Sequence, residues 1–241
     1  MGLLERFTNL LHRPAQRDET HGAVRIVVAS DDAHARMIWD MLTEQIEHGW
    51  DKRIPYAGAN PDDLYRPTLI GAWSQDRLIG GAFVMPDTQD AESFLLRHVH
   101  DGAQSIERRC CMIQGIATVP EHRGEGIGGR IKRFCDAWAA NHGAYIVLSI
   151  PTTQQAVRLN ENAGYHVLPP QVALVLQFQY TDHARMLVMP MDGTVPDSRW
   201  AVHVVREGAD PAILIGQLAP RQTPGGSDYQ ASDIIWMDRT I

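Results

Sequence analysis

The chain has 241 residues, of which 44% are hydrophobic and 21% are charged. These proportions are close to globular averages, and they exclude a disordered chain, a collagen-like fibre and a disulfide-dense mini-protein. The 22 basic and 29 acidic residues give a formal net charge of −7. Proteins that bind nucleic acid mainly by electrostatic attraction are usually basic, so the charge disfavours nucleic acid and anionic membranes as main partners.

The first 22 residues lack the long apolar run of a signal peptide or a membrane span. Five apolar side chains in this segment share one helical face: Leu3, Leu4, Phe7, Leu10 and Leu11. The pattern predicts a short amphipathic helix followed by a polar linker. We expect this helix to pack on the body of the protein or on a second subunit.

Apolar periodicity predicts alternating strands and helices between residues 23 and 180. Strands are expected at residues 23–29, 69–73, 78–85, 109–119, 144–150 and 172–180. Helices are expected from Asp32 to about Gly49 and at residues 93–100, 127–141 and 153–162. This order predicts an α/β fold in which helices flank a mixed β-sheet.

The tail from residue 181 has a different pattern. Four short apolar runs, at residues 186–191, 200–205, 212–218 and 234–237, are separated by Pro, Gly and Asp. Each run predicts a strand, and exposed strands there would favour a homodimer. We therefore expect three segments: an N-terminal helix and linker at 1–22, an α/β domain at 23–180 and a β-rich extension at 181–241.

The three cysteines form no CxxC pair, and an odd number makes a poor disulfide framework. Neighbouring residues of a strand point to opposite faces, so Cys110 and Cys111 are not expected to chelate one metal ion together. We expect buried, reduced thiols in a cytoplasmic protein that holds no metal. Among the basic residues only Lys52 and Lys132 are lysines, which indicates a compositional bias towards arginine.

The most informative segment runs from Gly115 to Gly129 and reads as a strand, a tight turn and the start of a helix. Its glycines allow backbone N–H groups to approach a ligand closely. The first turn of a helix also has unsatisfied N–H groups and the positive end of the helix dipole. Together these features predict a cradle for a pyrophosphate group. The Walker A motif is excluded because Arg130 follows Gly129, and the dinucleotide fingerprint matches imperfectly.

Two spaced motifs resemble those of the GNAT acyl-CoA N-acyltransferase superfamily. Arg123-x-x-Gly126-x-Gly128 is similar to the family's pyrophosphate loop, Arg/Gln-x-x-Gly-x-Gly/Ala. Thr153-x-x-Ala156-x-x-Leu159-Asn160-x-x-x-Gly164-Tyr165 is similar to the family's Asn-x-x-Ala-x-x-Leu-Tyr-x-x-x-Gly-Phe segment. The resemblance spans roughly residues 23–180. It implies a splayed sheet in which acetyl-CoA lies between the strands at 109–119 and 144–150.

The resemblance also implies which residues hold acetyl-CoA, without a metal. Backbone groups of Ile116, Ala117 and Thr118 are expected to pair with the pantetheine amides, like an added strand. The residues expected around the pyrophosphate are Arg123, Gly124, Glu125, Gly126, Ile127, Gly128 and Gly129. Thr153 and Asn160, from the second motif, complete the expected cofactor site.

One departure from the family concerns the general acid. The Tyr that frequently has this role is Asn160 here, and an amide cannot protonate a leaving thiolate at neutral pH. Candidates for the acid–base chemistry are Glu107 and a water held by Gln114, both along the strand that leads to the loop. Further alternatives are Tyr165, His98, His100, and catalysis by positioning and water chains alone.

Three functions remain open from the sequence. The first is an N-acetyltransferase in which the primary amine of a small molecule attacks the thioester directly in a ternary complex. There the backbone amide near Ala117 or Thr118 would polarise the thioester carbonyl. The second is a non-catalytic, regulatory acyl-CoA-binding protein, which Asn160 motivates. The third is a protein or peptide acetyltransferase that uses the β-rich tail as a docking surface.

Overall fold

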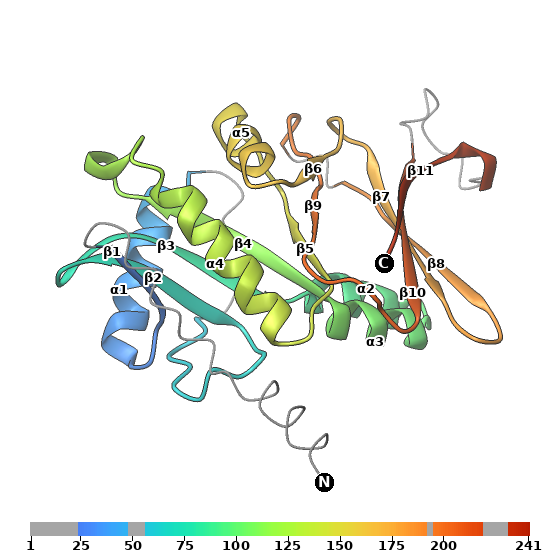
Figure 1. Cartoon of the computed structure of the whole chain (residues 1–241), viewed down its shortest axis with the longest axis horizontal. Coiled ribbons are helices and arrows are strands. Elements are labelled where there is room, and N and C mark those ends of the chain that lie inside the picture. Colours follow the sequence, from blue (N-terminus) through green and yellow to red (C-terminus); the bar gives the residue numbers. More distant parts are fainter. Residues whose placement is uncertain (1–23, 48–55, 192–194, 219–230) are drawn as a thin grey trace, which may run out of the picture.

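The structure, a computed structural model, describes residues 24–47, 56–191, 195–218 and 231–241 (Figure 1). Its elements in chain order are β1 (Val24–Val28), α1 (Asp32–Gln45), β2 (Thr68–Ser74), β3 (Arg77–Pro86), α2 (Thr88–Leu96), α3 (His100–Arg109), β4 (Cys110–Thr118), η1 (Pro120–His122), α4 (Ile127–Asn141), β5 (Ile146–Ser149), α5 (Gln154–Asn162), β6 (His166–Val167), β7 (Ala173–Gln179), β8 (Ala184–Met189), β9 (Ala201–Val204), β10 (Ala212–Leu218), η2 (Ala231–Asp233) and β11 (Ile234–Thr240). The predicted N-terminal helix lies outside the described residues. Within them, no helix is both long enough and apolar enough to cross a bilayer.

Seven strands form the first sheet, in the order β1-β2-β3-β4-β5-β9-β6. Strands β1 to β4 are antiparallel neighbours, β4 and β5 are parallel, and β9 lies between β5 and β6, antiparallel to both. The strands expected at 69–73 and 78–85 correspond to β2 and β3, which pair as an antiparallel hairpin. The mixed sheet expected from the order of elements is therefore confirmed.

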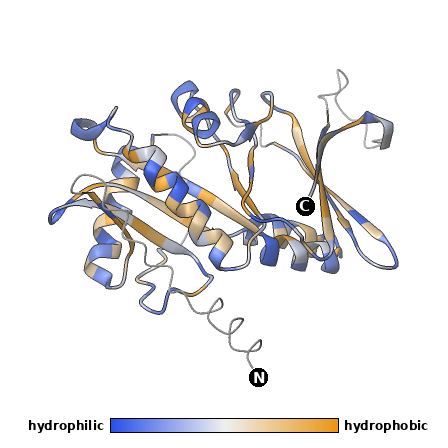
Figure 2. Cartoon of the chain, in the orientation of Figure 1, coloured by the Kyte–Doolittle hydropathy of each residue, from blue (hydrophilic) through white to orange (hydrophobic). Residues whose placement is uncertain are grey.

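The two faces of this sheet are covered by different elements because side chains alternate along each strand. On β4, Cys110 and Met112 belong to a buried cluster that includes side chains of α1, α2 and α3. Cys111 and Ile113 belong to the opposite cluster, which contains the apolar face of α4. All three cysteines are buried and free, as the sequence predicts. Figure 2 shows hydrophobic residues concentrated along the strands and hydrophilic residues in the loops.

The second sheet is antiparallel, in the order β11-β10-β7-β8, and Figure 1 shows it beside the first sheet, at the side of the C-terminus. Its inner side chains, among them Leu176 and Phe178, join the buried cluster of α1, α2 and α3. Each of the two sheets contains strands from before and after residue 180. Strand β7 precedes that residue but pairs in the second sheet, whereas β9 follows it and pairs with β5. A domain boundary at residue 180 therefore stays a prediction.

The connection between β3 and β4 is more helical than the sequence indicates. One helix is expected there, but the structure has two, α2 and α3. The buried residues of α3 are Gly102, Ala103, Ser105 and Ile106, so Ile106 is the one large apolar side chain on its inner face and the sequence signal for a helix is weak. A Cβ atom at Gly102 would lie 2.8 Å from Leu187 of β8. Because α3 approaches the second sheet closely, its inner face requires small residues such as Gly102.

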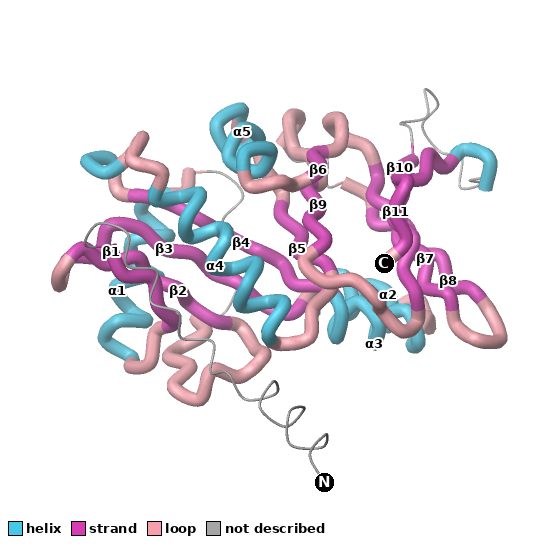
Figure 3. Tube along the Cα trace, viewed as in Figure 1, coloured by secondary structure: helices cyan, strands magenta, loops and turns pink. Residues whose placement is uncertain are grey.

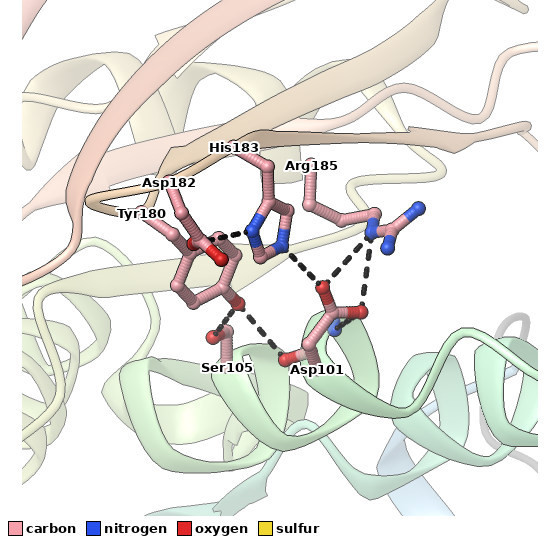
Figure 4. A network of polar contacts seen from close by, with 7 residues as sticks. Asp101, Ser105, Tyr180, Asp182, His183 and Arg185 are labelled. Atoms are coloured by element: carbon pink, nitrogen blue, oxygen red, sulfur yellow. Dashed lines mark hydrogen bonds and ion pairs between the residues drawn. The ribbon is translucent and has the colours of Figure 1, made fainter.

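Polar contacts attach α3 to the β7–β8 hairpin (Figure 4). The hydroxyl oxygen of Tyr180, which follows β7, lies 2.6 Å from Ser105 Oγ, and the Tyr180 hydroxyl donates to the carbonyl of Asp101 at 3.0 Å. The Asp101 carboxylate accepts a hydrogen bond from Arg185 Nε at 3.0 Å and lies 2.9 Å from His183 Nε2. Because Asp101 is near the start of α3, this one residue connects the helix to both sides of the hairpin, through its carbonyl to Tyr180 and through its carboxylate to His183 and Arg185.

These contacts shift two pKa values in opposite directions. Burial opposes the ionisation of Asp101, but hydrogen bonds from His183, the Gly102 N–H and Arg185 outweigh it and lower the pKa of Asp101 to about 2. Hydrogen bonds to Asp101 and Asp182 raise the pKa of His183. The stabilisation from Asp101 is lost as the pH falls towards about 2. The stabilisation from His183 is complete below about 6.5 and is lost as the pH rises through its raised pKa.

We predict that His183→Gln reduces the loss of folding stability that the wild-type protein shows as the pH rises. The melting temperature of the wild-type protein should fall between about pH 6 and pH 9 more than that of the variant, because only the wild type loses a proton from this network. Thermal unfolding at a series of pH values measures the difference. The control is His166→Gln, which removes an exposed histidine of β6. Parallel pH curves for the wild type and His183→Gln would contradict the assignment.

Candidate functional site

A cavity begins where β4 and β5 part. The two parallel strands are paired as far as Ile113 and Ser149, where β5 ends. Strand β4 continues to Thr118, and its other edge remains paired with β3 over that length. From Gln114 to Thr118, none of the described strands pairs with the edge of β4 that faces β5. Figure 3 shows the two strands diverging from their paired ends. Backbone groups of this edge are therefore available to a ligand.

The cavity between the diverging strands has a volume of about 650 Å³. Its wall consists of the second half of β4, the loop before α4, the first turns of α4, the end of β5 and one side of α5. The predicted site residues in this wall are Gln114, Ile116, Ala117, Thr118, Arg123, Gly124, Gly126, Ile127, Gly128, Gly129, Thr153 and Asn160. The fold thus brings the two sequence motifs to one cavity.

Glu125 and Glu107, two other predicted site residues, are not part of this wall. The Glu125 side chain is 53% exposed, and its Oε2 lies 3.0 Å from His122 Nδ1. Glu107 belongs to α3, not to the strand that leads to the loop, and lines a different hollow together with His100. The structure therefore separates Glu107 and His100 from Gln114, the acid–base candidate that lines the cavity.

The start of α4 has the features of an anion site. Gly126, its N-cap, has a φ of 78° and provides no side chain to cap the first N–H groups. Gly124 has a φ of 88°, a conformation that favours glycine. A Cβ atom added at either position would meet nothing within 4 Å, so neither glycine is required by packing. The backbone therefore exposes the positive end of the helix dipole to the cavity.

Arg123 fixes the loop in front of α4. Its Nε donates a hydrogen bond to the carbonyl of Thr118 at 3.1 Å, and its Nη2 donates to Gln45 Oε1 at 3.0 Å. Gln45 is the last residue of α1, so the guanidinium connects that helix to the end of β4. This contact positions Arg123 beside the glycine loop, at the same end of the cavity as the N-terminus of α4.

Gln114 is an extra residue in β4. The register between β3 and β4 shifts between Ile113 and Gly115, so Gln114 has no opposite partner on β3. Such a bulge bends a strand and re-aims its side chain. The Gln114 Nε2 donates a hydrogen bond to Gln89 Oε1 of α2 at 3.0 Å.

The two residues predicted from the second motif are both held by α5. Thr153 is the N-cap of α5, and its Oγ1 accepts a hydrogen bond from the Ala156 N–H at 3.1 Å. Asn160 is 4% exposed. Its Oδ1 accepts from Ser149 Oγ at 2.7 Å, and its Nδ2 donates to the carbonyl of Ala156 at 2.8 Å. Both groups of the Asn160 amide are therefore engaged within the protein.

Lys132, which neither sequence motif includes, lies next to Ser149. Lys132 of α4 is fully buried, yet it is part of the cavity wall. Its Nζ donates a hydrogen bond to Ser149 Oγ at 3.4 Å and lies 3.7 Å from the centre of the Tyr165 ring. Burial lowers the pKa of Lys132 from 10.5 to about 8, although Asp136 and Cys135 oppose the change.

Tyr165 and His203 complete the polar surroundings of Lys132. The Tyr165 hydroxyl donates to Asp136 Oδ1, and His203 Nδ1 lies 3.1 Å from Asp136 Oδ2. Burial raises the pKa of Tyr165 well above its usual value, and Asp136 adds to the effect. Tyr165 is therefore a buried support for this group and not a residue of the cavity wall.

The sequence did contain one signal for Lys132. In a chain whose basic residues are nearly all arginine, a lysine at an inward position of α4 is an exception. Arginine remains charged in proteins, whereas a buried lysine can lose its proton near neutral pH. Among the described residues, no group of three or more His, Cys, Asp or Glu side chains is placed to hold a metal ion.

Comparisons with known proteins agree with this architecture. No curated protein matches the chain. Among solved structures, yncA from Salmonella typhimurium, solved with its cofactor acetyl-CoA, has a TM-score of 0.50 at 16% identity, covering 78% of this chain and 98% of that one. A GNAT family acetyltransferase from Elizabethkingia anophelis with acetyl-CoA bound has a TM-score of 0.48 at 14% identity, covering 76% and 99%. The likeness to yncA shows a common fold.

A family profile identifies the chain itself. The profile of the acetyltransferase (GNAT) family matches residues 35–165, which are more than half of the sequence. The matched range contains β4, the glycine loop, α4, β5 and α5, the elements that form the cavity. The protein therefore belongs to the GNAT acetyltransferase family.

Proposed function

We propose that this protein is an N-acetyltransferase that transfers the acetyl group of acetyl-CoA to the primary amine of a small molecule. The observation that carries the proposal is one cavity that joins the unpaired edge of β4 to the glycine-rich start of α4. An unpaired strand edge suits the amides of an extended pantetheine chain. A helix N-terminus suits a pyrophosphate group. Acetyl-CoA contains both of these parts.

In the proposed reaction, the chain positions the thioester and polarises its carbonyl. The backbone N–H near Ala117 or Thr118 donates to the carbonyl oxygen, where negative charge develops during attack. The amine attacks directly in a ternary complex, without a covalent acyl-enzyme. A water held by Gln114, in the bulge of β4, takes the proton that the amine releases. The net charge of −7 favours the approach of a cationic acceptor, and free, buried thiols suit the cytoplasm.

A non-catalytic acyl-CoA-binding protein is the second candidate. It is favoured by one observation: Asn160 is held by Ser149 and Ala156 at the position of the family's frequent Tyr, and an amide cannot protonate a leaving thiolate at neutral pH.

A panel of amines distinguishes these functions. We predict release of free CoA thiol from acetyl-CoA with at least one small primary amine in the panel, at a rate above hydrolysis. Thiol release is followed with a chromogenic disulfide, and CoA binding is measured separately by calorimetry. A panel of peptides, assayed in the same way, tests whether the protein is instead a protein or peptide acetyltransferase. Tight CoA binding without turnover of any amine or peptide would leave the regulatory candidate.

We predict that Gly126→Ala lowers CoA affinity at least tenfold. The new Cβ atom would project into the open space at the start of α4, where the pyrophosphate is expected. The matched control is Gly208→Ala, because Gly208 also has a positive φ, 74°, with nothing within 4 Å, and lies outside the cavity wall. Both variants should lose about 1–2 kcal/mol of stability from backbone strain. Equal CoA affinity for the two variants would refute the cradle.

We predict that Gln114→Ala lowers turnover by about 10²-fold, because it removes the side chain that would hold the general-base water. Glu107→Gln should change turnover less than twofold, since Glu107 lies outside the cavity wall. Steady-state kinetics of both variants, with the best amine of the panel, measure the difference. The opposite ranking would assign the base to Glu107.

A further inference from the structure

The inference concerns the closed end of the cavity and rests on the proposed function. If the pyrophosphate lies at the start of α4 and the pantetheine chain follows the unpaired edge of β4, the thioester reaches the point where β4 and β5 come together. That point is marked by Ile113 and Ser149, the last paired residues of the two strands. Ser149 Oγ is the hydroxyl group on which Lys132 and Asn160 converge.

Lys132 is a costly residue to bury. An ammonium group removed from water needs compensating partners, and Lys132 has the Ser149 hydroxyl, the face of the Tyr165 ring and the more distant Asp136 carboxylate. The titratable groups that face this region come from three elements and one connecting segment: Cys135 and Asp136 on α4, Cys111 on β4, His203 on β9 and Tyr165 just before β6. An apolar side chain at this position would fill the same space without the free-energy cost of burying an ammonium group, so packing alone does not explain Lys132.

The other ionisable side chains of the described cavity wall differ from Lys132. They are Glu47, His122, Arg123 and Arg158, of which His122 is partly buried and the rest are exposed. Arg123 and His122 belong to the glycine loop, at the opposite end from Ser149. Lys132 is thus the buried proton carrier in the described wall, next to the end that receives the thioester.

We propose that Lys132 provides the positive charge and the proton for the CoA thiolate that leaves during acyl transfer, acting through the hydroxyl of Ser149. Asn160 has a supporting role, because its Oδ1 holds the Ser149 hydroxyl in place. Lys132 is a positioning residue in this scheme, and Ser149 is the group that meets the sulfur.

The amine nitrogen bonds to the acetyl carbon, the C–S bond breaks, and its electron pair goes to sulfur. The Ser149 hydroxyl turns from Asn160 Oδ1 towards the sulfur, gives its proton to it and takes one from the Lys132 ammonium. The amide nitrogen releases one proton to water, and neutral Lys132 takes one back from water. A lysine with a pKa of about 8 is suited to this exchange, because it is mostly protonated at neutral pH and gives up its proton readily.

The test titrates the thiol of bound CoA, which requires binding but no acceptor. Thiolate formation is followed by ultraviolet absorbance, with S-methyl-CoA as the blank. A nearby ammonium should lower the pKa of the bound thiol by about 1–3 relative to free CoA. Lys132→Met should return it to the free value or above. The matched control is Arg133→Met, which removes the exposed cation at the next position of α4 and should keep the low value.

The outcomes separate this inference from the proposed function. If the wild-type protein does not bind CoA, the proposed function and the inference both fail. If CoA binds but its thiol has the same pKa in wild-type protein and in solution, only the inference is overturned. That comparison needs no variant, so it holds even if Lys132→Met does not fold. Equal thiol pKa values in folded Lys132→Met and wild type would overturn the inference too.

A second readout uses the best acceptor of the amine panel. The wild-type kcat should fall as the pH rises through about 8, because Lys132 must be protonated to act. Ser149→Ala should lower kcat by about 10–100-fold while the Kd for CoA changes less than threefold. An unchanged kcat in Ser149→Ala would overturn the relay.

Discussion

The parting of β4 from β5 after Ile113 and Ser149 is the constraint on which the cavity depends. Up to that point the strands form an ordinary parallel pair, and beyond it the backbone of β4 has a partner on only one edge. An unpaired edge inside a fold is unfavourable unless something satisfies its N–H and C=O groups. The protein can maintain it because β3 holds the other edge of β4 and because β9 holds the other edge of β5. Each strand is thus fixed independently, and the gap between them persists.

The same gap explains why polar groups gather at its closed end. An apolar side chain at Ser149, Asn160 and Lys132 would fill the space and continue the buried cluster on the α4 side of the sheet. Instead, α4 places an amine there, β5 a hydroxyl and α5 an amide, all joined by hydrogen bonds. Buried polar groups stabilise a fold only when they are mutually satisfied, so this arrangement demands accurate placement of three elements. That placement is the property that a reaction at the thioester requires.

The second sheet has a supporting place in this architecture. Its inner face extends the buried cluster under the first sheet, and the contacts of Asp101 attach it to α3. The chain leaves the first sheet after β6, forms the β7–β8 hairpin and returns as β9. The hairpin is therefore inserted between two strands of the same sheet, and β9, which fixes β5, depends on the return of the chain from it. The second sheet thus supports the cavity indirectly, because the chain passes through it before it forms β9 beside β5.

The sequence by itself determined the glycine loop, both motifs of the family and the order of the strands and helices, apart from the second helix between β3 and β4 and the short strand β6. These features are local: a helix N-terminus needs its glycines next to the strand that precedes it, and periodicity reports which face of an element is buried. The tertiary structure alone decided which groups meet. Lys132, Ser149 and Asn160 are separated along the chain and converge only when α4, β5 and α5 pack. Likewise, the sequence placed Glu107 along the strand that leads to the loop, whereas the structure places it in α3, where it lines a different hollow. Contacts between distant segments depend on packing, and a linear pattern does not contain them.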